Sequence, residues 1–187
     1  MKTTLKHIAS IQTGVFAKPV PDGEVIYLQA KHFDEGGQIS AEFHPDLMVG
    51  TISEKHLLRQ GDVLFAAKGT KNFAAVYDIE EPAVASTSFF VIRLEEEFKQ
   101  RILTEFLAWL MNHPAAQGYL KGQAMGSSIV SISKGVLEEL EISIPNIATQ
   151  EIILKISNLR NKEIRLKQQL EMLKNKQIQQ IINNALK

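Results

Sequence analysis

Residues 149–187, TQEIILKISNLRNKEIRLKQQLEMLKNKQIQQIINNALK, decide the architecture of this 187-residue chain. The stretch contains neither glycine nor proline, and apolar residues recur in it at alternating steps of four and three residues. A 3.5-residue repeat of this kind predicts one long helix with a narrow apolar seam, as in a coiled-coil strand. The seam consists of Ile152, Ile156, Leu159, Leu166, Leu170 and Leu173, and Glu163 fills the one skipped position.

The length of this helix indicates what it does. From Thr149 to Ala185 it would extend roughly 55 Å at about 1.5 Å per residue. A domain built from the preceding residues is too small to cover such a seam, so we expect the helix to pair with a second helix, in the simplest case in a homodimer. The alternative is that the helix packs back on its own head. We therefore divide the chain into a globular head, residues 1–147, and a pairing and spacing helix, residues 148–187.

The head alternates short β-branched or aromatic segments with turn residues. Strands are predicted over residues 24–30, 63–67, 74–79, 88–94 and 137–145, and amphipathic helices over residues 102–111 and 114–120. The predicted fold class is α+β: a β-rich domain with a mixed or antiparallel sheet and some helices, followed by one long C-terminal coiled-coil helix.

Composition excludes several classes of protein. The chain has no cysteine, so disulfides and thiolate chemistry are impossible. There is no apolar run of about 18 residues and no apolar segment near the N-terminus, so we expect no membrane span, no secretory signal and a cytoplasmic location. Charge is unevenly spread: residues 1–148 carry 13 Lys/Arg and 18 Asp/Glu, a net of −5, and residues 149–187 carry 8 and 3, a net of +5.

Signs of catalysis are weak. The sequence has no nucleophile elbow, no phosphate-binding glycine loop and no metalloprotease helix. Its five histidines stand without the spacing of metal ligands, at positions 7, 32, 44, 56 and 113. We expect no enzymatic activity, no catalytic residue, no metal and no cofactor.

Polar loops after predicted strands are the candidates for binding. Lys68, Gly69, Thr70, Lys71 and Asn72 follow a strand and offer two cations for phosphates, together with an amide that can read adenine. The alternative for this loop is a solvated hairpin turn. Further candidates for DNA contact are Gln12, Thr13 and Lys18 in a second loop, Gln29 and Lys31 in a third, and Ser127 and Ser128 in a fourth.

Two of these candidate positions have other interpretations. Ser127 and Ser128 could equally cap local backbone groups. Arg93, near the end of a predicted strand, is expected to pair with the adjacent acidic run Glu95–Glu97.

The order of segments resembles a known family. Residues 58–70, LRQGDVLFAAKGT, are similar to a recurring segment in the target-recognition domains of type I restriction–modification specificity subunits. Residues 5–14, LKHIASIQTG, resemble the start of such a domain, and residues 126–152 resemble its link to the family's conserved helix. The chain departs from the family's pattern in two ways: it has room for one recognition domain and one helix instead of two of each, and its linker lacks the common double proline.

The resemblance implies a noncatalytic reader of double-stranded DNA. It implies that the protein brings a DNA methyltransferase subunit, with or without a restriction subunit, to a bipartite DNA site. It also implies that two antiparallel helices space two recognition domains along the DNA. A chain with one of each would be a half-subunit that must pair, either with itself or with another half-subunit. The alternative function is a noncatalytic assembly protein, with a dimerising helix and a head that binds protein rather than DNA.

Overall fold

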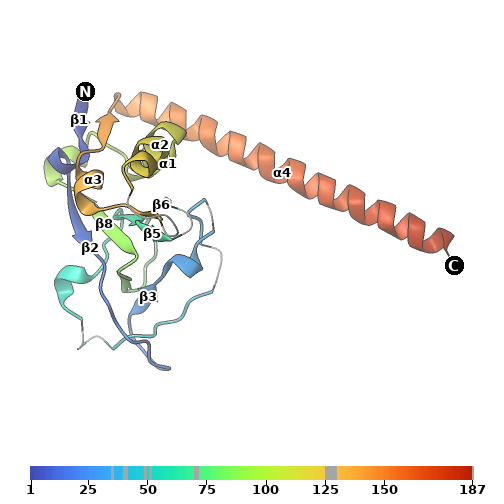
Figure 1. Cartoon of the computed structure of the whole chain (residues 1–187), viewed down its shortest axis with the longest axis horizontal. Helices are drawn as coiled ribbons and strands as arrows, with labels where there is room; N and C mark the ends of the chain where they lie inside the picture. The colour runs from blue at the N-terminus through green and yellow to red at the C-terminus, as the bar shows by residue number, and fades with distance from the viewer. Residues whose placement is uncertain are drawn as a thin grey trace. The chain divides into compact units, whose positions relative to one another are not determined.

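The structure is a computed structural model that describes residues 1–34, 36–39, 42–48, 50, 52–69, 72–124 and 130–186. The chain forms two compact units, Met1–Ile147 and Ala148–Lys187. The first is a globular head and the second is a single helix (Figure 1). The α+β fold class and the long C-terminal helix are confirmed.

A four-stranded antiparallel sheet forms the centre of the head. Its strands lie in the order β2 (Ala9–Thr13), β8 (Phe89–Leu94), β4 (Val63–Ala66) and β6 (Ala74–Val76). Phe65 on β4 lies opposite Phe90 on β8 and opposite Ala74 on β6. The predicted strands over 63–67, 74–79 and 88–94 are therefore present.

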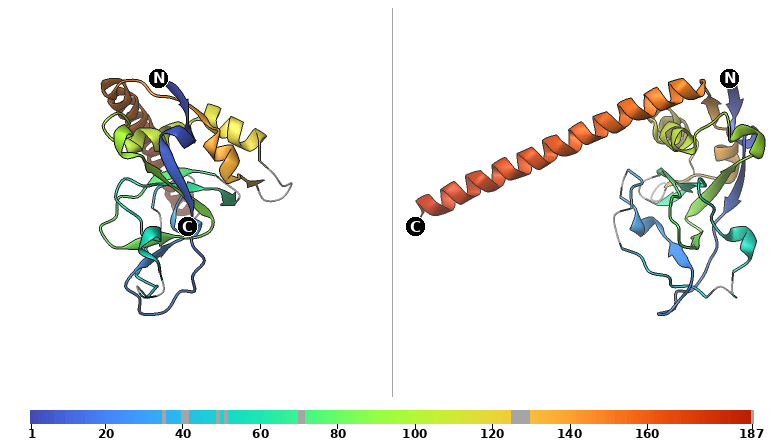
Figure 2. Two further views of the ribbon diagram at one scale, coloured as in Figure 1. Left: turned by 90° about the vertical axis from the view of Figure 1, so that its left-hand side faces the viewer. Right: turned by 180° about the vertical axis from the view of Figure 1, so that it is seen from behind.

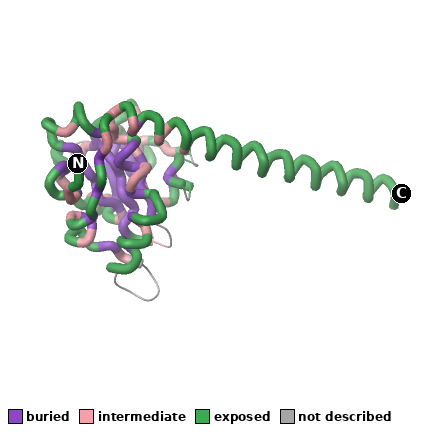
Figure 3. The backbone as a smooth tube through the Cα atoms, turned by 90° about the horizontal axis from the view of Figure 1, so that it is seen from above, coloured by how far each residue is buried: buried purple, intermediate pink, exposed green. Residues whose placement is uncertain are grey.

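Both faces of this sheet are buried. Side chains alternate along β4, so that Val63 and Phe65 enter one apolar cluster while Leu64 and Ala66 enter another. A strand covered on both faces must be apolar at every position, which explains the uninterrupted run Val-Leu-Phe-Ala. Figure 3 shows that the buried residues concentrate in the head.

Helices cover one face of the sheet. α1 (Thr104–Asn112) and α2 (Pro114–Gly122) lie on this side, and β3 (Ile26–Leu28) lies on the other (Figures 1 and 2). The side chains from the helices that join the cluster on this face include Leu107, Met111 and Leu120. The two predicted helices are present, each shifted by no more than two residues at either end.

The predicted strand over residues 137–145 is only partly correct. Ser133 accepts a hydrogen bond from the N–H of Val136 (3.3 Å), and this cap begins helix α3 (Lys134–Glu138). The strand β10 occupies only Glu141–Ser143. The alternating apolar residues Leu140, Ile142 and Ile144 are all buried, which produced the strand signal, but the hydroxyl cap decides the local structure before them.

The remaining strands form three two-stranded sheets. β1 (Lys2–Thr4) is antiparallel to β10, β3 is parallel to β7 (Ala83–Ala85), and β5 (Lys68–Gly69) is antiparallel to β9 (Val130–Ser131). Strand β7 was not predicted from the sequence. Short 3-10 helices occur at η1 (Leu5–His7), η2 (Ala30–His32), η4 (Glu54–His56) and η5 (Glu96–Phe98).

The second unit is the helix α4, which spans Ile147–Ala185 and contains 39 residues. At about 1.5 Å per residue its length is about 58 Å. Its one buried residue among those described is Gln150. In the described part of the chain, no helix is both long enough and apolar enough to cross a bilayer.

Candidate nucleic-acid interface

Three separate segments of the head meet at the turn Ser86–Ser88, which joins β7 to β8. The N–H of Ser86 donates to the carbonyl oxygen of Leu28, the last residue of β3 (2.8 Å). The carbonyl oxygen of Ser88 accepts from the N–H groups of Ala67 (2.9 Å) and Lys68 (3.4 Å). The residues that follow β3 and β4 are therefore held beside one turn.

The end of β2 reaches the same turn. Thr13, the last residue of β2, lies opposite Phe90, and the N–H of Gly14 donates to the carbonyl oxygen of Phe89 (3.0 Å). A Cβ on Gly14 would lie only 2.1 Å from the carbonyl oxygen of Ser86, so the close approach requires glycine. Gln12 and Thr13 were predicted in a loop, but they belong to β2.

Four polar residues are brought together by these contacts, and we call them the strand-end cluster: Thr13, Gln29, Lys68 and Thr87. Thr13, Lys68 and Thr87 are exposed and Gln29 is half-buried. Ser86, in the same turn, is buried, and its hydroxyl lies 2.6 Å from the hydroxyl of Ser88. The cluster presents hydroxyl, amide and ammonium groups, which are the groups that bind phosphates and base edges.

The first candidate loop divides into described and undescribed parts. Lys68 and Gly69 form β5, and Gly69 has a φ of 144°, which favours glycine. Thr70, Lys71, Ser127 and Ser128 lie outside the described residues. The ladder between β5 and β9 pairs Gly69 with Val130, so two of the predicted loops adjoin the same pair of strands in sequence.

Asn72 is used inside the protein. Its side chain is buried, and Nδ2 donates to the carbonyl oxygen of Ala66 at 2.8 Å. That bond closes the connection between β4 and β6. The amide that was expected to read adenine thus supports the shape of the loop in this structure.

The other candidate residues are two lysines, Lys18 before β3 and Lys31 after it. Lys18 and Lys31 are exposed. Lys31 lies in η2 beside His32, whose Nδ1 accepts from the N–H of Gln29 (3.3 Å). Burial, and then the charge of Lys31, lower the pKa of His32 from its ordinary value, while Asp46 acts in the opposite direction. The neutral ring is the form that can accept this hydrogen bond.

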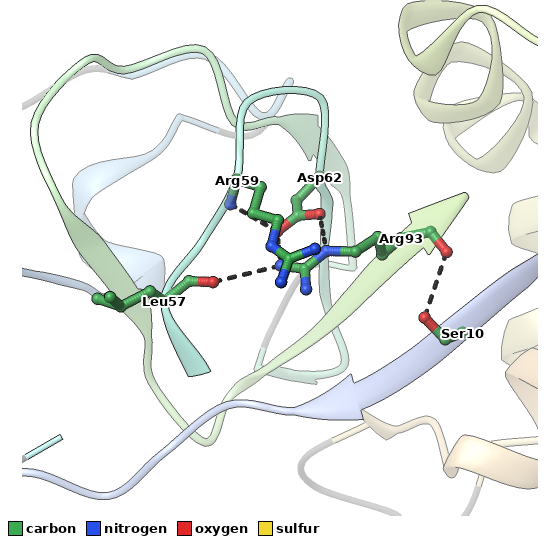
Figure 4. A network of polar contacts seen from close by, with 5 residues as sticks. All are labelled: Ser10, Leu57, Arg59, Asp62 and Arg93. Atoms are coloured by element: carbon green, nitrogen blue, oxygen red, sulfur yellow. Dashed lines mark hydrogen bonds and ion pairs between the residues drawn. The ribbon is translucent and has the colours of Figure 1, made fainter. Parts of the chain in front are cut away.

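A polar network stabilises the opposite end of the sheet (Figure 4). Arg93 on β8 donates from Nε (2.7 Å) and Nη2 (2.6 Å) to the carboxylate of Asp62, and Nη2 also donates to the carbonyl oxygen of Leu57 (3.2 Å). The N–H of Arg59 donates to the same carboxylate (2.8 Å). Arg93 therefore pairs with Asp62, and the prediction that it pairs with the run Glu95–Glu97 is wrong.

This network fixes the turn within the segment Leu58–Gly69 and the start of the strand that follows it. Gly61 has a φ of 85°, which suits a tight turn, and Asp62 fastens that turn before the buried strand begins. Hydrogen bonding by Asp62 raises the pKa of Arg93, so the arginine remains charged although it is largely covered. The turn sets where β4 starts and hence where Lys68 lies.

The predicted pairing residues all lie on α4 and are exposed. Their exposed fractions run from 53% at Leu170 to 62% at Ile156. Exposure on this scale over a continuous seam is unusual for large apolar side chains in a monomer. Glu163, within the seam, accepts from Arg160 (2.8 Å) and Lys167 (2.6 Å) of its own helix.

Sequence reasoning missed the turn Ser86–Ser88. A Ser-Thr-Ser triplet between two apolar runs is itself a turn signal. Its importance comes from hydrogen bonds to β3 and β4, which lie far away in sequence. Among the described residues, no group of three histidine or acidic side chains is placed to hold a metal ion.

Comparison with solved structures gives the same fold. The S subunit of a type I restriction-modification system from M. genitalium matches with a TM-score of 0.60 and 16% identity over 88% of this chain and 40% of that one. The HsdS subunit from Thermoanaerobacter tengcongensis matches with a TM-score of 0.65 and 19% identity, over 91% of this chain and 44% of that one. A chain from a structure that describes the assembly and conformational transition of the type I R-M system matches with a TM-score of 0.64 and 12% identity. The match covers 88% of this chain and 39% of that one.

This chain spans about two-fifths of the length of these relatives. No curated protein matches it significantly in sequence. The model of the type I restriction modification DNA specificity domain matches residues 21–179, which is most of the chain and includes the strand-end cluster except Thr13. The chain therefore belongs to the type I restriction modification DNA specificity domain family.

Proposed function

We propose that this chain recognises a DNA sequence in a type I restriction–modification complex and directs a DNA methyltransferase to it, without catalysing a reaction itself. The observation that carries the proposal is the strand-end cluster, in which exposed Thr13 and Lys68 lie beside the turn that contains exposed Thr87, on a fold of this family. Polar side chains on strand ends and a turn that are joined by backbone hydrogen bonds suit recognition, because rigid elements place donors more precisely than free loops do.

Each member of the cluster has a distinct role in the proposal. Lys68 contacts a phosphate and sets the register of the protein on the duplex. The hydroxyls of Thr13 and Thr87 donate to phosphates or base edges, and the amide of Gln29 reads a base, adenine being the usual partner. Lys18, Lys31 and the undescribed candidates Thr70, Lys71, Ser127 and Ser128 extend the interface, and Asn72 keeps the loop in shape.

We further propose that α4 pairs with the helix of a second recognition unit and spaces the two heads along DNA. About 58 Å of helix corresponds to about 17 base pairs at about 3.4 Å each. The site is then bipartite. Pairing with a second copy of this chain gives inverted half-sites, whereas pairing with a different unit gives unlike halves.

Methylation mapping tests the proposal. The gene is expressed with a type I methyltransferase in a host that lacks DNA methylases, and methylated positions are read by long-read sequencing. We expect one new bipartite motif that depends on this gene. The variants Lys68→Ala and Thr87→Ala should weaken methylation of that motif while leaving the complex intact.

Lys99→Ala is the matched control, because Lys99 is an exposed lysine near Arg93, at the other end of β8. It should leave methylation unchanged. Equal loss in Lys99→Ala and Lys68→Ala would contradict a role for the cluster, and a motif that persists in all the cluster variants would do so too.

A second candidate function is favoured by the acidic head, whose net charge is −5. In this alternative the helix dimerises and the head binds another protein. Purified chain that shows no affinity for the mapped motif, yet still forms its protein complex with Lys68→Ala, would support this assembly role.

A further inference from the structure

The charged residues beside the seam of α4 carry a single sign. With Ile156, Glu163 and Leu170 at heptad position a, the other seam residues, Ile152, Leu159, Leu166 and Leu173, fall at position d. The positions that flank the seam are then e and g. Six of the seven flanking positions from 155 to 176 are cationic, and the seventh is Gln169. We call these six the flanking cations: Lys155, Arg160, Lys162, Lys167, Lys174 and Lys176.

The acidic residues of the helix do not compensate for them from flanking positions. Glu151 and Glu171 fall at outer positions of the heptad, and Glu163 falls within the seam. Glu163 pairs with Arg160 and Lys167 of its own helix. Within the described residues, Lys155, Lys162, Lys174 and Lys176 form no ion pair, and all four are exposed.

This pattern decides which second helix suits the seam. In a coiled coil the e and g residues of one helix contact those of its partner, and their charges set partner choice. In a parallel pair of identical helices, Lys155 would face Arg160 of the other copy. In an antiparallel pair e faces e and g faces g, so cations again meet cations. Neither orientation of two copies yields an opposite-charge contact between the flanks.

We propose that the partner of α4 is a helix of a different chain, with an apolar heptad seam flanked by acidic residues. This rests on the proposed pairing of α4 and selects among its possible partners, against the homodimer expected from the sequence alone. DNA is a poorer occupant, since a duplex offers phosphates for the cations but no apolar stripe for six exposed aliphatic side chains.

The test uses the full chain and two variants that share its seam. In the acidic-flank variant all six flanking cations are changed to Glu, and in the neutral-flank variant all six are changed to Gln. Association is measured by sedimentation equilibrium at low salt, and circular dichroism checks that each chain keeps its helix content.

We expect the natural chain mixed with the acidic-flank variant to form a 1:1 dimer at least on the order of tenfold tighter than the natural chain forms with itself. The neutral-flank variant should self-associate more tightly than the natural chain. Both differences should shrink as salt rises towards 1 M, because exposed charges are screened. Leu166→Asp in the acidic-flank variant should abolish the mixed dimer.

Each other outcome is decisive. Self-association of the natural chain as tight as the mixed dimer would overturn the inference and leave the proposed pairing intact. Absence of any association among the three chains would overturn both. Binding of an unrelated duplex that disappears in the neutral-flank variant, without a mixed dimer, would assign the cations to phosphates. The methylation experiment on the head does not depend on any of these results.

Discussion

At the scale of single residues, the ion pair of Asp62 and Arg93 fastens β8 to the turn that begins β4. Asp62 is 2% exposed and the side chain of Arg93 is 19% exposed, so both groups have lost most of their water. A buried pair contributes little compared with apolar residues of the same size, but the loss of one partner leaves an unpaired buried charge. The other partners of the pair, Arg59 and Leu57, would lose their place as well.

Asp62→Asn should therefore lower the free energy of unfolding by about 3 kcal/mol, at the lower end for buried pairs because Arg93 keeps some contact with water. Urea denaturation of both proteins measures the difference. Glu96→Gln is the control: it removes an exposed pair with Lys99 and should cost less than about 1 kcal/mol. If the two variants unfold at equal urea concentrations, the network contributes no more to the free energy of unfolding than an exposed ion pair does.

His32 makes stability depend on pH. Its pKa is lowered in the folded head, mainly by burial, whereas the unfolded chain takes up a proton near pH 6.5. Unfolding binds a proton in the interval between these values, so the free energy of unfolding falls as the pH drops below about 6.5. Protonation of Nδ1 would also remove the acceptor for the N–H of Gln29.

His32→Asn checks this expectation, because its Oδ1 can accept a hydrogen bond at any of these pH values. Urea denaturation from pH 7.5 to 5 should show a smaller decline for the variant than for the natural chain, with the other four histidines common to both. A parallel decline in the two proteins would show that His32 contributes nothing to the dependence.

At the scale of elements, the turn Ser86–Ser88 holds together strand ends whose proximity cannot be inferred from local sequence preferences. The N–H of Ser86 donates to Leu28 at the end of β3, and the carbonyl oxygen of Ser88 accepts from the residues after β4. The neighbouring carbonyl oxygen of Phe89 accepts from the N–H of Gly14, which follows β2. Backbone bonds of this kind position the strand-end cluster without help from its side chains. Recognition residues can then differ without disturbing the strands that hold them.

Gly14→Ala should separate the end of β2 from this turn, since the new Cβ would meet two carbonyl oxygens within 2.5 Å. We expect a loss of about 1–3 kcal/mol of stability and weaker binding to the mapped DNA motif. Thermal unfolding and DNA titration measure the two effects. Gly118→Ala in α2, where a Cβ meets nothing within 4 Å, should be neutral or stabilising. An unchanged melting temperature for Gly14→Ala would mean that the turn tolerates displacement.

At the scale of the whole molecule, opposite charges are kept in different units. The head has a net charge of −5 and the helix one of +5. A head with that charge gains little from general attraction to phosphates, so any DNA binding by it has to rest on local contacts. The helix gains little stability by itself, because its seam is exposed and tertiary packing supplies most of the stability of such a helix.

Ending the chain at Ile147 should leave a folded head, because the three apolar clusters contain only residues of the head. We expect the fragment to melt within a few degrees of the full chain, measured by circular dichroism, and to bind DNA more weakly than a paired protein with two heads. A fragment that fails to fold would show that α4 contributes to the stability of the head.

Periodic patterns in the sequence determined the long helix and the central strands of this protein, and tertiary contacts decided how the elements are joined. The 3.5-residue repeat after Thr149 predicts the long helix, and continuous apolar runs predict β4 and β8, because burial on a face is a local and repetitive requirement. The partner of Arg93, the convergence on Ser86–Ser88 and the inward use of Asn72 depend on residues far apart in sequence or on burial. No local pattern records such pairings, since each consists of hydrogen bonds that form only when the chain closes into its fold.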